Sequence, residues 1–259
     1  MRVRVINRRK NSMELSSSHD NIFSEVSSIA APRGIPADIA SISGAQVLRP
    51  EVFRLAGKRR SANATPAHMR GVSCFGAGSE IITQSGVKSA SKLKVGDKVL
   101  TRDNGFQRIL WVGPVQSEAA IPMTVEIASD AVTAGKPEKT VRIAARQSVL
   151  LTCPEIQSQF GSAEVLARAG DLLHLDGFTA SETAEASVAI LTEHHEILNI
   201  SGLWMDSLIP DSDTLSALPA TEKQAIKGLL PSLSDLPVER SYPSARILLR
   251  SEFARQFTR

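Results

Sequence analysis

The residue with the clearest chemical potential is Cys74, which stands where the sequence changes character. Before it, residues 1–73 are basic and rich in serine, and after it short apolar runs alternate with turns. Gly76 and Gly78 let the chain bend just behind the thiol, so we expect the sulfur close to the peptide bond that precedes it. A thiolate in that position can attack the carbonyl carbon of Ser73, which makes the bond between Ser73 and Cys74 a candidate scissile bond.

Two turns must support this cysteine. An Asn-Gly pair at residues 104–105 separates two runs of strand-forming residues, 98–102 and 106–112, and this pair suits a two-residue type I′ turn. We therefore expect a β-hairpin here. A second turn is expected at residues 95–97, where Asp97 hydrogen-bonds nearby amides rather than acting as a catalyst.

Together these segments resemble the opening of the Hint (Hedgehog/intein-type) domain in its bacterial form. The shared pattern is a cysteine followed by Phe and a small-residue turn, an Ile-Ile-Thr strand, a Leu-x-Val-Gly-Asp turn and a Val-Leu-Thr-Arg-Asp-Asn-Gly hairpin that closes on a tryptophan. Residues 195–210 are similar to the family's His-Glu strand, its Ala-Asn-Gly-Leu turn and its Glu-Ser-Phe-x-Pro-Gly close. The resemblance covers residues 74–211, with a helical tail to about residue 257.

The resemblance implies an all-β Hint fold with pseudo-twofold strand architecture, short C-terminal helices and a partly disordered N-terminal arm. We expect three parts: a basic, serine-rich extension and linker at 1–73, the Hint domain at 74–211, and a helical C-terminal extension of that domain at 212–259. Further strands are expected at residues 122–128, 139–145, 148–152 and, as a pair, 187–200. Proline, glycine and capping signals predict helices at residues 50–57, 225–230 (after a capping box at 221–224) and 244–257.

In this family the cysteine converts the preceding peptide bond into a thioester by an N-to-S acyl shift, and a second nucleophile then releases the N-terminal part. The amide nitrogen leaves only if an acid protonates it. The family places a histidine before a Val-Leu-Leu strand for this purpose, whereas Gln147 stands at that position in this chain. An amide side chain donates a hydrogen bond but no proton, and loss of a general acid typically slows a reaction by about 10² to 10⁴.

His195 is the remaining candidate, because the family also has a histidine at this position. Its functional role would be to orient groups near Cys74 or to activate the second nucleophile; its structural alternative is a half-buried histidine bonded to the backbone. Neighbours on a strand point to opposite faces, so only one of His194 and His195 can face the site, and a metal site is not expected. The candidate catalytic residues are therefore Cys74, His195 and Gln147, with no cofactor.

Full protein splicing is excluded by the sequence. It requires a downstream asparagine, usually after a histidine, and no His-Asn pair occurs; the only asparagine after His195 is Asn199, inside an expected strand. The expected substrate is therefore the chain's own N-terminal segment. The acyl acceptor, whether water, a thiol, a hydroxyl compound or an amine, is unknown.

Three functions remain open at this point. The first is an autoprocessing Hint domain that cleaves or transfers its N-terminal arm. The second is a catalytically degenerate Hint domain that serves as a structural or interaction module, favoured by Gln147, by Ala144 and by Ser201 in place of the family's asparagine. The third is a cysteine hydrolase acting in trans, which needs a histidine base within reach of Cys74.

Net charge and cysteine content limit which binding partners and which cellular compartment we expect. Residues 1–73 hold 12 Lys and Arg against 5 Asp and Glu, a net charge of +7, whereas the remainder holds 18 against 22, a net charge of −4. The basic clusters lack aromatic neighbours, so we expect solvated charge rather than a nucleic-acid site. No signal peptide or membrane span is visible, which favours the cytoplasm unless another export route exists. Cys74 and Cys153 are expected to be reduced.

Overall fold

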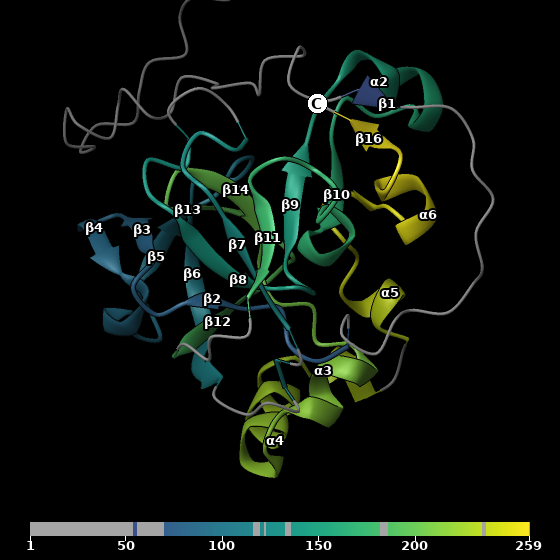
Figure 1. Ribbon diagram of the computed structural model, residues 1–259. Helices are drawn as coiled ribbons and strands as arrows, with labels where there is room; N and C mark the ends of the chain where they lie inside the picture. Colours follow the sequence, from purple (N-terminus) through teal and green to yellow (C-terminus); the bar gives the residue numbers. More distant parts are fainter. Residues whose placement is uncertain are drawn as a thin grey trace, which may run out of the picture. The chain divides into compact units, whose positions relative to one another are not determined.

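Strands dominate the part of the chain that the computed structural model describes (Figure 1). The described residues are 54–55, 70–115, 120–121, 123–132, 136–181, 186–234 and 237–258. They fall within one compact unit, residues 36–259. The basic clusters and most of the linker expected in residues 1–73 lie outside the described residues, and the predicted domain boundaries stay predictions.

One 14-stranded sheet runs through this unit in the order β11-β7-β8-β2-β12-β6-β5-β3-β13-β14-β9-β10-β15, with β4 beside β3. Its strands are β2 (Phe75–Gly76), β3 (Glu80–Thr83), β4 (Gly86–Ser89), β5 (Lys98–Leu100), β6 (Phe106–Val115), β7 (Thr124–Ile127), β8 (Val141–Ala144), β9 (Ser148–Leu151), β10 (Val165–Arg168), β11 (Phe178–Ser181), β12 (Ser187–Thr192), β13 (Ile197–Ile200), β14 (Leu203–Asp206) and β15 (Ile247–Leu248). The all-β prediction is therefore confirmed.

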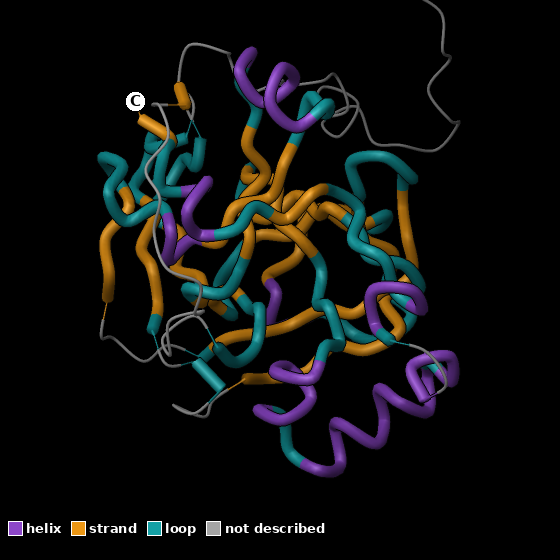
Figure 2. The backbone as a smooth tube through the Cα atoms, turned by 90° about the vertical axis from the view of Figure 1, so that its right-hand side faces the viewer, coloured by secondary structure: helices purple, strands orange, loops and turns teal. Residues whose placement is uncertain are grey.

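The helices are short and most of them follow the strands in sequence. They are α2 (Pro154–Phe160), α3 (Ser212–Ala217), α4 (Ala220–Leu229), α5 (Val238–Ser241) and α6 (Ser251–Ala254), with single 3₁₀ turns at Ala90–Lys92, Ala169–Asp171 and Pro231–Ser234. Figures 1 and 2 both place α3 and α4 at the end of the unit opposite to α2. None of the helices in the described ranges is both long and apolar enough to cross a lipid bilayer.

The predicted β-hairpin is confirmed, although its turn is longer than expected. β5 and β6 pair antiparallel. Gly105 has a φ of 63°, but Asn104 has no positive φ, so the turn is not type I′. Instead, the main-chain N–H of Thr101 donates to the carbonyl of Gly105 at 2.8 Å and closes a loop around residues 102–104.

The turn at Asp97 also forms as predicted. Gly96 adopts a φ of 92°, which glycine tolerates. The Asp97 carboxylate accepts hydrogen bonds from the main-chain N–H of Lys94 at 3.0 Å and from Lys88 Nζ at 2.9 Å. Asp97 is thus a turn-forming residue, and its contact with Lys88 also holds β4 in place.

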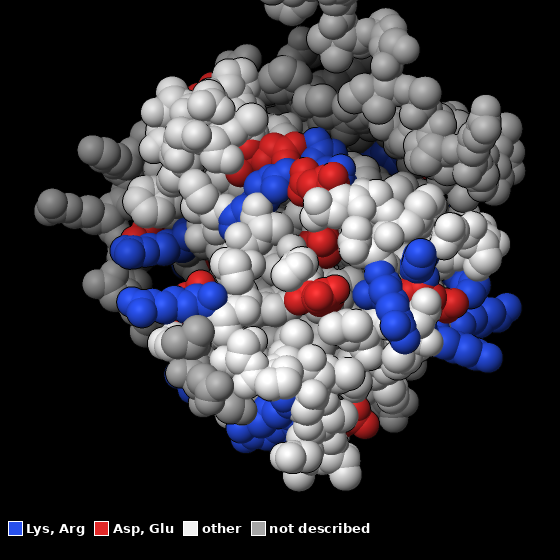
Figure 3. All heavy atoms as spheres, turned by 180° about the vertical axis from the view of Figure 1, so that it is seen from behind, with Lys and Arg blue, Asp and Glu red and all other residues white. Residues whose placement is uncertain are grey.

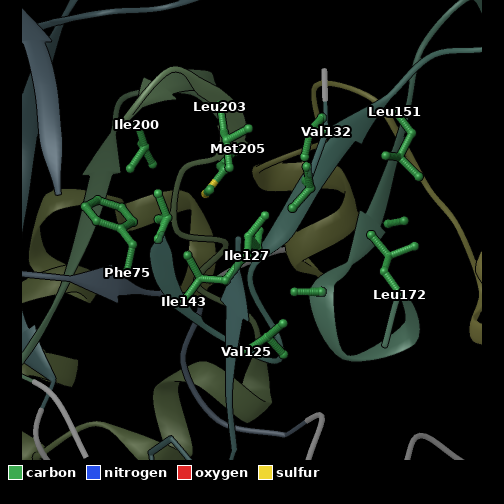
Figure 4. Close-up of a cluster of buried hydrophobic side chains, with 14 of the residues drawn as sticks. Phe75, Val125, Ile127, Val132, Ile143, Leu151, Leu172, Ile200, Leu203 and Met205 are labelled. Carbon is green, nitrogen blue, oxygen red and sulfur yellow. The ribbon is translucent and has the colours of Figure 1, made fainter. Parts of the chain in front are cut away.

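A hydrophobic core lies where strands from both halves of the chain meet (Figure 4). Side chains from β2, β7, β8, β13 and β14 point toward one another there and are at most 1% exposed; they are Phe75, Ile127, Ile143, Ile200 and Met205. Successive residues of a strand face opposite sides of a sheet. Packing of Met205 into this core therefore directs the next residue of β14, Asp206, away from it.

A second buried cluster contains the cysteine and extends into the C-terminal helices. It joins Cys74 to Trp111 of β6 and to four side chains from the C-terminal segment: Leu218, Ile226, Leu230 and Tyr242. Two polar contacts hold this segment in place. Trp111 Nε1 donates to Glu222 at 2.7 Å, and the Tyr242 hydroxyl donates to the Thr192 carbonyl at 3.0 Å.

Two helix predictions are corrected by pairing between distant segments. Arg54–Leu55, inside the helix predicted at 50–57, forms strand β1, which pairs antiparallel with β16 (Phe257–Thr258). The helix predicted at 244–257 is replaced by β15, α6 and β16. The helix predicted at 225–230 does form, within α4, but the capping box predicted before it is wrong, because α4 begins at Ala220 without a side-chain cap. Local propensity is a weak signal that tertiary contacts override.

The strand pair predicted at residues 187–200 is wrong in its pairing. Both strands exist, but β12 pairs with β6 and β2, whereas β13 pairs with β14 and β3. The connection between them therefore crosses from one part of the sheet to another. It carries both candidate histidines.

Acidic and basic side chains lie next to one another at several places on the face shown in Figure 3. Ion pairs of this kind include Arg102 with Glu164, and Arg246 with both Asp103 and Glu164. On this face of the part of the chain that the structure describes, charges of both signs are therefore interspersed.

We predict that Ile226→Ala lowers the free energy of unfolding by about 2 to 5 kcal/mol, because it leaves a cavity beside the cysteine cluster. Ile226 is 0% exposed. Leu229→Ala in the same helix is the control, since Leu229 is 41% exposed and should change stability by less than about 1 kcal/mol. Urea denaturation measures both, and equal effects would contradict the packing of α4 on this cluster.

Candidate functional site

Cys74 lies immediately before β2 and is completely enclosed, with 0% of its surface exposed. Its carbonyl accepts a hydrogen bond from the main-chain N–H of Ala144 at 2.9 Å. Its thiol hydrogen-bonds with the side chain of Ser187 at the start of β12. The cysteine is therefore fixed between the ends of β8 and β12.

The peptide bond between Ser73 and Cys74 shares this enclosure. Ser73 is only 8% exposed, and the main-chain N–H of Val72 donates to the Ala120 carbonyl at 2.8 Å. Arg70, a few residues upstream, is exposed. The chain thus enters the site from the surface and brings its own peptide bond beside the thiol.

Burial decides the protonation state of the nucleophile. It raises the pKa of the Cys74 thiol to about 12 from an ordinary value of 9.0, and the hydrogen bond with Ser187 offsets this only in part. At neutral pH the group is therefore a thiol, not a thiolate. Attack on any carbonyl requires loss of this proton first.

Gln147 lies in the turn between β8 and β9 and is 1% exposed. Its main-chain N–H donates to the carbonyl of Ala144, and the N–H of Ala144 in turn donates to the carbonyl of Cys74. Its side-chain Nε2 donates to the main-chain oxygen of Asp206 at 2.8 Å and to the Asp206 carboxylate. A primary amide has two N–H groups, so both are used and neither is available to polarise the scissile bond.

Asp206 is the residue of the candidate site that the sequence analysis missed. It ends β14, is 3% exposed, and its Oδ1 accepts from Gln147 Nε2 and from the main-chain N–H of Ser148 at 2.9 Å. Its other oxygen, Oδ2, lies 3.7 Å from His195 Nε2. A carboxylate at the end of an otherwise apolar strand was the available signal, because buried carboxylates are rare unless they have partners.

His195 lies in the connection between β12 and β13, not on a strand as expected. It is 4% exposed, whereas His194 is exposed. Its Nδ1 accepts a hydrogen bond from the main-chain N–H of Ala245 at 2.9 Å. Its ring packs edge-on against the ring of Tyr242, with the two ring centroids 6.3 Å apart. A main-chain N–H can only donate, so Nδ1 carries the lone pair and the neutral ring carries its proton on Nε2.

The hairpin loop anchors the segment that carries His195. Asn104 Nδ2 donates to both carboxylate oxygens of Glu196 at 3.0 Å, and the main-chain N–H of Arg102 donates to the Ile197 carbonyl at 2.8 Å. Glu196 is 3% exposed, and burial raises the pKa of its carboxyl group. The Asn-Gly hairpin thus positions the histidine connection through its loop.

Asp206 brings two of the three predicted site residues together, with Gln147 on one side and His195 on the other. Cys74 joins this network through Ala144, while its thiol bonds Ser187 rather than either histidine. Within the described ranges, no three His, Cys, Asp or Glu side chains gather in a group that could hold a metal ion. Both cysteines are free.

A protein-family model described as "Hint domain" matches residues 73–212, more than half of the chain. Among solved structures, the gp41-1 intein is 12% identical over 51% of this chain and 96% of its own, with a TM-score of 0.32. The MchDnaB-1 intein is 12% identical over 51% of this chain and 98% of its own, with a TM-score of 0.33. No match is found among curated proteins.

We predict that iodoacetamide labels Cys74 of the folded protein extremely slowly, because the thiol is 0% exposed and burial raises its pKa. Because an enclosed thiol must be uncovered before the reagent can reach it, the labelling rate should rise with pH only until the uncovered thiol is ionised, near its ordinary pKa of 9.0. Peptide mapping separates Cys74 from Cys153, and the guanidinium-unfolded chain is the control. Equal labelling of folded and unfolded Cys74 would contradict the enclosure.

Asn104→Ala should destabilise the protein by about 1 to 3 kcal/mol, because it leaves the buried Glu196 carboxylate without its amide donor. Lys98→Ala on the same hairpin is the matched control, since Lys98 is exposed. Thermal unfolding at matched pH compares the two. If Asn104→Ala loses no more stability than Lys98→Ala, the anchoring role of the hairpin loop is refuted.

Proposed function

Because the chain belongs to the Hint domain family, we propose that it processes itself at the bond between Ser73 and Cys74. The Cys74 sulfur bonds to the Ser73 carbonyl carbon, the bond from that carbon to the Cys74 nitrogen breaks, and a second nucleophile releases or transfers the N-terminal segment. The proton lost by the thiol balances the one gained by the nitrogen. The shift is therefore an isomerisation that needs no co-reactant.

One observation carries this proposal: the thiol and the peptide bond before it are enclosed together. Cys74 is 0% and Ser73 8% exposed. An intramolecular attack needs no access from solvent, and alignment of the two groups can replace much of the activation entropy. A cysteine hydrolase acting in trans would need an exposed thiol with a histidine base, so the enclosure disfavours that alternative. The substrate in this proposal is the chain's own N-terminal segment.

The same geometry implies a slow reaction. The thiol is protonated at neutral pH because burial raises its pKa to about 12. Gln147 donates both N–H groups to Asp206, and His195 in its neutral form offers one N–H on Nε2 and no free lone pair. The His195 N–H can donate a hydrogen bond, but neither side chain transfers a proton readily.

A catalytically degenerate Hint module is the second candidate function. The engaged amide of Gln147 favours it, because the position that carries the family's acid is here part of a hydrogen-bond network. In that case the thiol serves only as a buried apolar group within the cysteine cluster.

The deciding experiment is the intact mass of the full-length protein during incubation with dithiothreitol. The proposal predicts two fragments that divide between Ser73 and Cys74, and none from Cys74→Ala. Cys153→Ala is the matched control, since it removes the other buried cysteine and should leave cleavage intact. An intact wild-type chain after prolonged incubation would replace autoprocessing with the degenerate module.

Gln147→His should accelerate cleavage by about 10² to 10⁴, because it restores a group that can transfer a proton at the turn linked to Cys74. Gln147→Ala removes the amide without adding an acid and serves as the comparison. Fragment formation measured over time by mass spectrometry gives both rates. Equal rates for the two variants would show that a missing acid does not limit the reaction.

A further inference from the structure

The C-terminal extension contributes directly to the surroundings of His195. The match to the Hint domain model ends at residue 212, yet Tyr242 contacts the His195 ring and the main-chain N–H of Ala245 donates to Nδ1. We propose that Ala245 is a positioning residue of the acyl shift: its N–H fixes His195 as the Nε2–H form and so makes the C-terminal extension part of the processing site. This inference rests on the proposed function.

The first step of the argument is the direction of the hydrogen bond. A main-chain amide has no lone pair to offer, so at 2.9 Å from Ala245 N the His195 Nδ1 must be the acceptor. Ser244 Oγ lies 3.5 Å from the same nitrogen, on the same side of the ring. The single proton of the neutral ring is therefore on Nε2.

The second step is that this Nε2–H group remains available. Among the described residues it has no hydrogen-bond partner although it is buried. Asp206 Oδ2, at 3.7 Å, is beyond hydrogen-bonding distance but close enough to attract the N–H group and hold the ring orientation. A buried donor without a partner is costly, and such groups concentrate where function requires them.

The third step concerns what a neutral imidazole with a fixed tautomer can do. It stabilises negative charge on an oxygen that forms during reaction by donating a hydrogen bond, without giving up its proton. Attack of the Cys74 sulfur on the Ser73 carbonyl generates such an oxygen. A histidine fixed in this way suits hydrogen-bond donation and not general-base activation of a second nucleophile, which was one of the roles expected for His195.

The fourth step is that the segment carrying Ala245 is held firmly in place. Tyr242, 3% exposed, packs in the cysteine cluster and donates its hydroxyl to the Thr192 carbonyl at 3.0 Å. After Ala245, strand β15 pairs in parallel with β10. The Ala245 N–H is thus positioned from both sides by contacts that belong to the C-terminal extension.

A direct test uses the ¹⁵N-labelled Cys74→Ala protein, which stays whole: NMR should detect a coupling across the hydrogen bond from Ala245 N to His195 Nδ1. The ring ¹⁵N shifts should show protonated Nε2 and unprotonated Nδ1. Ala245→Pro, which lacks the N–H, should lose this pattern, whereas Ala245→Gly, which keeps it, should retain it. A proton on Nδ1 in the parent protein would overturn the proposal.

The kinetic arm uses the full chain with intact Cys74 and dithiothreitol. Ala245→Pro should slow cleavage between about twofold and tenfold, as expected for loss of one neutral hydrogen bond, and Ala245→Gly should not. In a His195→Gln background, Ala245→Pro should have no further effect, because it acts through the histidine. An equal slowing in both backgrounds, or faster cleavage by Ala245→Pro, would refute the positioning role.

The two arms separate this inference from the proposed function. If no variant or wild-type chain is cleaved, autoprocessing fails, and the NMR arm still decides whether Ala245 sets the form of His195. If the wild type is cleaved but Ala245→Pro leaves the tautomer pattern of His195 unchanged, only the positioning role fails.

Discussion

The site depends on one buried carboxylate, that of Asp206. A buried charge is tolerated only when donors surround it, and here Gln147 Nε2 and the Ser148 N–H bind one oxygen while His195 lies beside the other. The half-buried Arg168 adds an electrostatic contribution. Burial is the largest cause that lowers the pKa of Arg168, and the nearby charge of Arg146 lowers it further. Asp206 is among the carboxylates that oppose this decrease. Removal of the carboxylate would leave several buried donors unpaired at once.

This constraint links segments that are distant in sequence into one site. Asp206 orients the turn that holds Gln147, that turn bonds Ala144, and Ala144 bonds the carbonyl of Cys74. The C-terminal extension adds the Ala245 donor and packs in the same buried cluster as Cys74. The result is a Hint domain whose candidate nucleophile is enclosed and protonated and whose Gln147 amide is committed to a structural role.

Features set by local chemistry could be predicted from the sequence. The hairpin and the Asp97 turn follow from their turn residues, the all-β class follows from the resemblance to the Hint family, and all three are confirmed. The β1–β16 pairing could not be predicted, because it joins residues about 200 positions apart and nothing local to Arg54 indicates its partner. Asp206 was overlooked because its burial follows from the packing of Met205 on the opposite side of β14.

The central claim is that a thioester forms between Ser73 and Cys74, and its most direct measurement is the mass of the released N-terminal fragment after hydroxylamine treatment. Hydroxylamine attacks a thioester far faster than a peptide bond, so the account predicts a fragment that ends at Ser73 as a hydroxamate. The partner fragment should begin at Cys74 with a free thiol. A fragment that ends at Ser73 as a free acid under the same treatment, or a chain that remains whole, would contradict the acyl shift.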